Sequence, residues 1–188
     1  MRWLLLFIFC LPSLIISQEL PPITNFDTKT YEAGNQNWMV SEANNNWMYF
    51  ANNSGLLSYN GEQWGLYKMK DGSPVRSVKV VDSLIFTGAY MDFGYWKPNA
   101  YGNLDYTSLL DKLPSEIRDG EQIWHIEEFG KYIIFQSLSR IFSYHIEDKS
   151  INIIDLGKTI SNLYKSNNTV YFQVAEDGLY AIEDSGIE

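Results

Sequence analysis

Short runs of alternating apolar and polar residues fill most of the chain after its first twenty residues. Four apolar runs end in a phenylalanine and pass through a short polar turn into a second apolar run. A period of two is typical of β-strands with one buried face. The phenylalanines that end the first runs are Phe50, Phe86, Phe135 and Phe172, and successive ones lie 36, 49 and 37 residues apart. We use them as the anchors of the four repeats.

Further apolar stretches flank each pair, so each repeat holds four strands in sequence order. Those upstream are residues 38–40, 75–80, 123–126 and 160–163, and those downstream are 63–67, 104–107 and 151–154. No outer strand is recognisable in the fourth repeat. A spacing near the roughly 40–45 residues of a propeller blade favours an all-β, partial β-propeller of four-stranded antiparallel blades. The expected blades are 36–70, 75–110, 121–156 and 159–188.

About three and a half blades cannot close a ring, so we expect them to belong to a larger propeller. The alternative is one compact sandwich of about fifteen strands. The longer middle spacing is explained by an insertion at residues 97–120, which contains two prolines and two glycines. Within it, residues 107–118 are expected to form a short helical turn.

Glycine follows the turn between the second and third strands in three repeats, at Gly55, Gly94 and Gly178. A turn of this kind often needs a positive φ, which glycine adopts without a Cβ clash. The third repeat has Arg140 at this place, so its turn is expected to differ.

The first residues have the layout of a secretory signal peptide. Arg2 precedes an apolar run at residues 3–16, and the small residue Ser17 follows it. This run is shorter than the roughly 20 apolar residues of a membrane helix. We therefore predict a signal peptide at residues 1–17 and a lead-in at 18–35, with an uncleaved anchor as the alternative. Both the signal peptide and the anchor would place the rest of the chain outside the cytoplasm. Cys10, the only cysteine of the sequence, lies inside the predicted signal peptide, so the mature chain is expected to contain none.

Two segments, residues 52–61 and 176–180, resemble the two-component regulator propeller repeat, in which Gly-Leu follows a strand and a tyrosine comes shortly after. Residues 31–38, 75–77 and 88–96 look like the N-terminal sensor region of triple-tyrosine-motif regulators from Bacteroidetes-type bacteria. The third repeat departs from the pattern because it lacks the Gly-Leu pair.

The resemblance implies a periplasmic propeller followed by a tyrosine-rich sandwich, a membrane helix and a cytoplasmic output module. That module is a histidine kinase or a helix-turn-helix regulator, and none of these later parts lies in this sequence. The segment would then sense a ligand for an inner-membrane receptor that regulates transcription. The full-length receptor is expected to form a homodimer and to be tethered through its C-terminal part.

Charge and chemistry narrow the function further. A net charge of −9 makes direct nucleic-acid contact unfavourable. His125 and His145 lack the spacing of a metal pair, and no Gly-x-Ser-x-Gly motif occurs. Glu127 and Glu128 are neighbours in a strand and point to opposite faces. We therefore expect no catalytic residue, metal or cofactor, and no enzymatic activity in this segment.

A ligand site is expected on the face that carries the inter-blade loops and the turns between second and third strands. Its candidate residues are Asn53, Arg76, Tyr90, Asp92 and Trp124. Arginine, a carboxylate and aromatic rings together suit a glycan or another polar small molecule, although each residue also fits turn formation or packing. Alternatives to the sensor are a secreted scaffold that binds a protein or glycan, and part of a glycan-active propeller enzyme.

Overall fold

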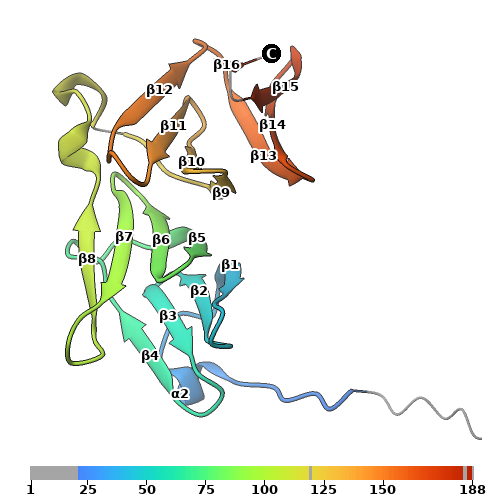
Figure 1. Cartoon of the computed structure of the whole chain (residues 1–188). Coiled ribbons are helices and arrows are strands. Elements are labelled where there is room, and N and C mark those ends of the chain that lie inside the picture. The colour runs from blue at the N-terminus through green and yellow to red at the C-terminus, as the bar shows by residue number, and fades with distance from the viewer. Residues whose placement is uncertain (1–20, 119, 184–185, 188) are drawn as a thin grey trace, which may run out of the picture.

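The computed structural model describes residues 21–118, 120–183 and 186–187, so the predicted signal peptide lies outside the described residues. Within them the chain forms four separate four-stranded antiparallel sheets. Figure 1 shows the sheets following one another along an arc, in the order of the sequence. This arrangement confirms the all-β propeller fold and excludes a sandwich of two packed sheets.

Each sheet is a meander whose strands pair with their neighbours in sequence. The first comprises β1 (Asn37–Glu42), β2 (Met48–Asn52), β3 (Gly55–Tyr59) and β4 (Trp64–Tyr67). The second comprises β5 (Val75–Val81), β6 (Leu84–Ala89), β7 (Phe93–Pro98) and β8 (Leu104–Ser108). The third comprises β9 (His125–Phe129), β10 (Tyr132–Gln136), β11 (Arg140–His145) and β12 (Ile151–Asp155). The fourth comprises β13 (Ile160–Ser166), β14 (Thr169–Val174), β15 (Gly178–Glu183) and β16 (Gly186–Ile187).

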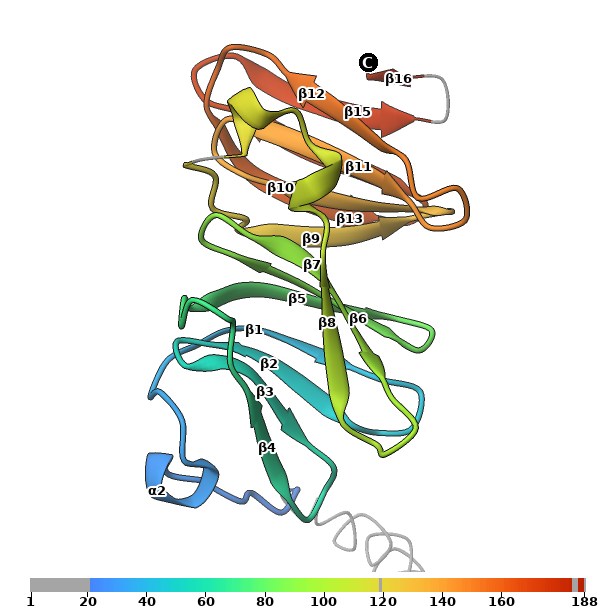
Figure 2. The same cartoon turned by 90° about the vertical axis from the view of Figure 1, so that its left-hand side faces the viewer.

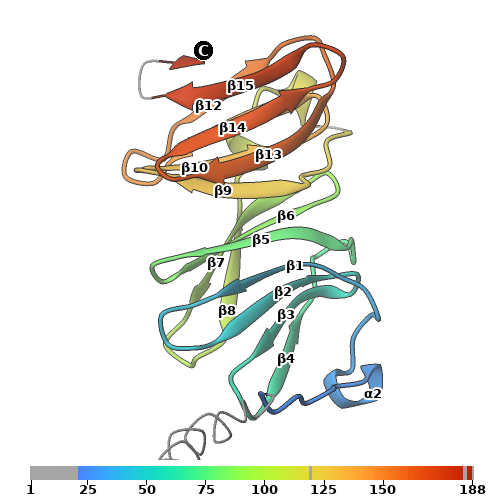
Figure 3. The same ribbon diagram turned by 90° about the vertical axis from the view of Figure 1, so that its right-hand side faces the viewer.

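Three apolar clusters join successive blades face to face. Tyr49 packs with Val78 between the first two blades, and Phe86 packs with Phe135 between the second and third. The third cluster includes Phe172. Figure 2 shows the stacked sheets, and Figure 3 shows the first strands β1, β5, β9 and β13 following one another along one side. The alternating apolar residues are buried because each blade covers its neighbour's face.

The fourth blade corrects the expectation that it lacks an outer strand. Strand β16 pairs antiparallel with the end of β15, Ile187 lying opposite Ile182. The strand has two residues, which is too short for an alternating pattern to show in the sequence. The insertion behaves as expected, since it contains two 3-10 turns, Leu110–Lys112 and Ser115–Ile117.

The glycine expectation is right for Gly55 and wrong for Gly94 and Gly178. Gly55 has a φ of 136°, whereas the other two have no positive φ. The positive φ of the second turn falls on Met91, at 57°. Gly94 is instead needed for close approach, because a Cβ there would overlap the carbonyl oxygen of Thr107 in β8. Gly178 has open space beside it, since β16 pairs only with the far end of β15.

The lead-in packs on the outside of the first blade. It contains the short helix α2 (Thr28–Tyr31), capped by the Asp27 side chain. Phe26 and Tyr31 contact the Trp64 ring at centroid distances of 5.2 and 5.4 Å. Among the described residues, no helix has the length and apolar character needed to cross a membrane.

Candidate ligand site

The first strand of several blades begins with a β-bulge, and this irregularity positions the candidate site. In β1 the register shifts between Asn37 and Met39, which sets Trp38 out of the ladder. In β5 the shift lies between Val75 and Ser77 and does the same to Arg76. A bulge re-aims the side chain of the extra residue. Both side chains are thus removed from the alternation that would bury every second residue.

Trp124 reaches the same place from the third blade. It immediately precedes β9, and its backbone N–H donates to the Gln136 carbonyl at 2.8 Å. The guanidinium carbon of Arg76 lies 4.2 Å from the ring centroid of Trp38 and 5.9 Å from that of Trp124. The two tryptophan rings meet edge to face at 6.1 Å. This is a cation–π cluster assembled from three blades.

Asn53 holds the cluster together. Its side-chain oxygen accepts hydrogen bonds from Trp38 Nε1 and from Arg76 Nη1, both at 2.8 Å. Asn53 lies in the turn between β2 and β3, and its backbone N–H donates to the Gln36 carbonyl at 3.2 Å. The turn of the first blade therefore orients a side chain of the second. We call Trp38, Asn53, Arg76 and Trp124 the rim cluster.

Neighbouring Asn52 anchors the chain that enters this cluster. Its fully buried amide donates to the Gly34 carbonyl and to Asn37 Oδ1, each at 2.7 Å. Its oxygen accepts from the backbone N–H groups of Gly34 and Ser54. A buried, fully hydrogen-bonded amide specifies one arrangement of the segments that it joins. The start of β1, and with it Trp38, is therefore held firmly.

The electrostatics of the rim cluster depend on Arg76. Partial burial lowers the pKa of its guanidinium, which nevertheless stays charged at any ordinary pH. In the part of the chain that the structure describes, Arg76 has no ion pair with a carboxylate. Two buried N–H donors, Arg76 Nε and Trp124 Nε1, have no hydrogen-bond partner.

Tyr90 and Asp92 lie on the turn of the second blade and make no hydrogen bond with the rim cluster. The Asp92 carboxylate accepts from Ser108 Oγ at 2.7 Å, and burial raises its pKa. Tyr90 is 47% exposed, and its backbone forms a bridge with Gln122. Of the five predicted residues the structure thus brings Asn53, Arg76 and Trp124 together. A ligand-binding role for all five stays a prediction.

Trp38 is the member of the cluster that the sequence analysis did not select. Strict alternation assigned it to an inner strand, whereas the bulge sets it out of the ladder, and it is 41% exposed. A signal was present in the repeats, because a tryptophan lies at or next to the start of the apolar stretch upstream of the anchoring phenylalanine in both repeats, Trp38 in residues 38–40 and Trp124 in residues 123–126. Comparing these two positions would have found it.

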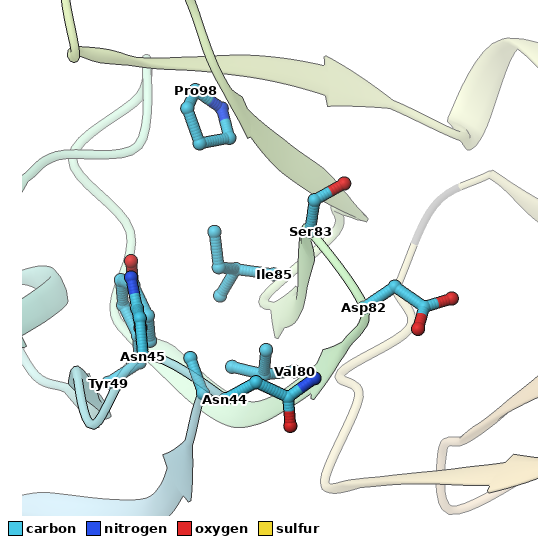
Figure 4. Close-up of a pocket in the computed structure, with 9 residues that line it drawn as sticks. Asn44, Asn45, Tyr49, Val80, Asp82, Ser83, Ile85 and Pro98 are labelled. Carbon is cyan, nitrogen blue, oxygen red and sulfur yellow. The ribbon is translucent and has the colours of Figure 1, made fainter.

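A separate hollow of about 240 Å³ lies between the first two blades, at the opposite ends of the strands. Figure 4 shows its lining, in which Tyr49, Val80, Ile85 and Pro98 contribute apolar surface. Asn44, Asn45, Asp82 and Ser83 come from the turns around it. The described side chains that line this hollow include no unpartnered buried donor, so the rim cluster is the stronger candidate.

The two histidines lie apart from the rim cluster's hydrogen bonds. Burial lowers the pKa of His125 in β9, while His145 Nδ1 lies 3.1 Å from the Asp148 carboxylate. Across residues 21–118, 120–183 and 186–187, no three His, Cys, Asp or Glu side chains gather as a metal site. The rim cluster itself presents a cation, aromatic faces and N–H donors.

Comparison with known proteins supports the fold. No protein-family description and no curated protein matches the sequence. Among solved structures, the extracellular domain assigned to a hybrid two-component system, BT4673 from B. thetaiotaomicron, aligns with a TM-score of 0.63. It is 15% identical, and the match covers 84% of this chain and 21% of that one.

The corresponding domain of BT3049 from B. thetaiotaomicron aligns with a TM-score of 0.60 and 16% identity, over 89% of this chain and 24% of that one. PorZ, a surface component of the type-IX secretion system of Porphyromonas gingivalis, aligns at 0.52 and 14%, over 76% and 19%. The chain thus spans about a fifth to a quarter of these chains. In fold it is similar to extracellular domains of two-component systems, which fits its resemblance to the two-component regulator propeller repeat.

Proposed function

We propose that this chain is an exported, ligand-sensing propeller segment of a membrane signalling receptor and is not itself catalytic. The observation that carries the proposal is the rim cluster, in which three blades each contribute a side chain to one charged, aromatic surface. The similarity to extracellular domains of two-component systems supports the same role. The ligand would be a glycan or another polar small molecule.

The arrangement explains how binding here would be sensed. Trp38, Arg76 and Trp124 belong to the first, second and third blades, so a ligand that contacts them all favours one relative placement of those blades. A ligand shifts an equilibrium by its difference in affinity between two states. In the full-length receptor, tethered in the membrane and paired as a homodimer, this preference would bias the output module that controls transcription.

The proposal is tested by titrating the exported chain with a panel of mono- and disaccharides while following tryptophan fluorescence. We expect saturable binding that weakens about tenfold in Trp124→Ala, because one aromatic contact is removed. Trp47→Ala is the matched control, since Trp47 stacks on Tyr49 away from the rim cluster. The proposal fails if no saccharide binds, or if both substitutions weaken binding equally.

A further inference from the structure

Arg76 differs from the other arginines that the structure describes. Arg118 lies 3.6 Å from the Asp111 carboxylate, and Arg140 pairs with both Glu121 and Asp155. Arg76 has instead the neutral amide of Asn53 and two aromatic rings. On a chain with a net charge of −9, an arginine that faces no carboxylate is a local excess of positive charge.

The rim cluster also has more hydrogen-bond donors than acceptors. The Asn53 side-chain oxygen has two lone pairs, and both are taken, by Trp38 and Arg76. Arg76 Nε and Trp124 Nε1 are donors without partners in the described structure, and both atoms are buried. Guanidinium and indole nitrogens donate and cannot accept. Because a guanidinium offers donors and no acceptor, a ligand that contacts Arg76 must supply acceptors.

Three carboxylates of the second and third blades and of the segment between them already have partners. Asp92 accepts from Ser108, Glu121 pairs with Arg140, and Glu127 pairs with Lys79 at 2.7 Å. None of them forms an ion pair with Arg76 in the described structure. A planar guanidinium binds a carboxylate through two parallel hydrogen bonds, which is the strongest pairing available to it.

We infer that the rim cluster binds a sugar acid, whose carboxylate pairs with Arg76 and whose ring packs on the exposed surface of Trp38. Trp38, at 41% exposed, offers the apolar face that such a ring needs. The inference rests on the proposed function, because it names the ligand class of the same site.

The test compares glucuronate, glucose and inorganic sulfate by calorimetric titration of the exported chain. Glucuronate is expected to bind at least about tenfold more tightly than glucose or sulfate, since it alone supplies both the carboxylate and the ring. Arg76→Gln should abolish this preference. Arg118→Gln is the control, because it removes the same charge from the insertion, where Arg118 pairs with Asp111.

A second variant keeps the test decisive if Arg76→Gln does not fold. Asn53→Asp places a carboxylate where Arg76 Nη1 already donates, so it should compete with glucuronate and weaken its binding about tenfold while the fold is retained. Equal affinity for glucuronate and glucose, or sulfate binding as tightly as glucuronate, overturns the sugar-acid inference. If neutral saccharides bind and Trp124→Ala weakens them, the proposed function stands without it. If no saccharide binds, acidic or neutral, both fail.

Discussion

Two arginines on the same face of the propeller have different surroundings, one among carboxylates and the other among uncharged side chains. Arg140, at the turn of the third blade, is enclosed by Glu121 and Asp155, and Glu121 also accepts from Ser139 Oγ at 3.0 Å. Arg76, at the start of the second blade, is held by an amide and two tryptophans. Removing one partner of a buried ion pair strands the other charge. We therefore interpret Arg140 as structural and Arg76 as available to a ligand.

The comparison extends to the repeat itself, because Arg140 begins the third strand of its blade, where the first and fourth blades have glycine. In the third blade the Ser137 hydroxyl closes the turn, since it accepts from the backbone N–H groups of Ser139 and Arg140. The third blade thus combines a turn closed by serine with a charged network around Arg140.

The largest expected effect comes from adding a methyl group at the repeat glycine. Gly94→Ala should lower the free energy of unfolding by about 3 kcal/mol, because the new Cβ overlaps a backbone carbonyl that cannot rotate away. Gly178→Ala, with open space around it, should change stability by less than about 0.5 kcal/mol. Urea unfolding measures both. Equal losses would contradict the assignment of close approach to Thr107 as the constraint at Gly94.

The next largest effect is the difference in stability loss between substitutions of Arg140 and of Arg76. Arg140→Gln should cost about 2 kcal/mol of stability, since Glu121 is only 6% exposed and would lose its cation while Ser139 remains. Arg76→Gln should cost at most about 1 kcal/mol, the size of a partly exposed cation–π contact. Thermal unfolding of both variants at the same pH checks the difference. A larger loss at Arg76 would contradict its assignment as the arginine left free for a ligand.

A smaller change in stability should follow when Arg76 is given a carboxylate partner, as Arg140 already has. Asn53→Asp should raise stability by about 0.5 kcal/mol, as expected for a partly exposed ion pair. Because salt screens such a pair, the gain should shrink in 1 M NaCl, where the Debye length falls to about 3 Å. Melting temperatures at low and high salt measure this. A gain that salt does not reduce would point to a cause other than charge pairing.

The last effect depends on pH and concerns Asp92, whose pKa is raised by burial. The folded state then binds a proton more tightly than the unfolded state, so stability falls as pH rises from the ordinary value of 3.8 through the raised pKa. Asp92→Asn keeps an acceptor for Ser108 and removes the ionised form. It should stabilise the chain at pH 7 by less than about 1 kcal/mol, and the difference should vanish near pH 3. Unfolding curves across this range test the sign.

The repeats made the fold predictable, because alternation and spacing are properties of consecutive residues. The four predicted strands that contain an anchoring phenylalanine and precede a polar turn are β2, β6, β10 and β14. Strand β16 was missed, since two residues carry no period. The role of Gly94 was also missed, because its constraint comes from Thr107 in the next strand and not from the turn.

The candidate site was predictable in part. Asn53, Arg76 and Trp124 were placed on one face from the order of strands alone, and the structure brings them into one cluster. The position of Trp38 in the cluster depends on the bulge in β1. A bulge is a shift in the pairing of two strands, so it cannot be predicted from the residues of either strand alone.

The sequence by itself determined the repeated four-stranded unit, the acidic charge and the residues available on the rim. Those features depend on local periodicity and composition. The tertiary structure alone decided that Arg76 contacts two tryptophans of other blades and that the Asn53 side-chain oxygen accepts hydrogen bonds from both Trp38 and Arg76. It also decided that Arg140 pairs with carboxylates, whereas Arg76 pairs with none in the described structure. These outcomes depend on how separate blades pack against one another, and on distances between side chains far apart in the chain.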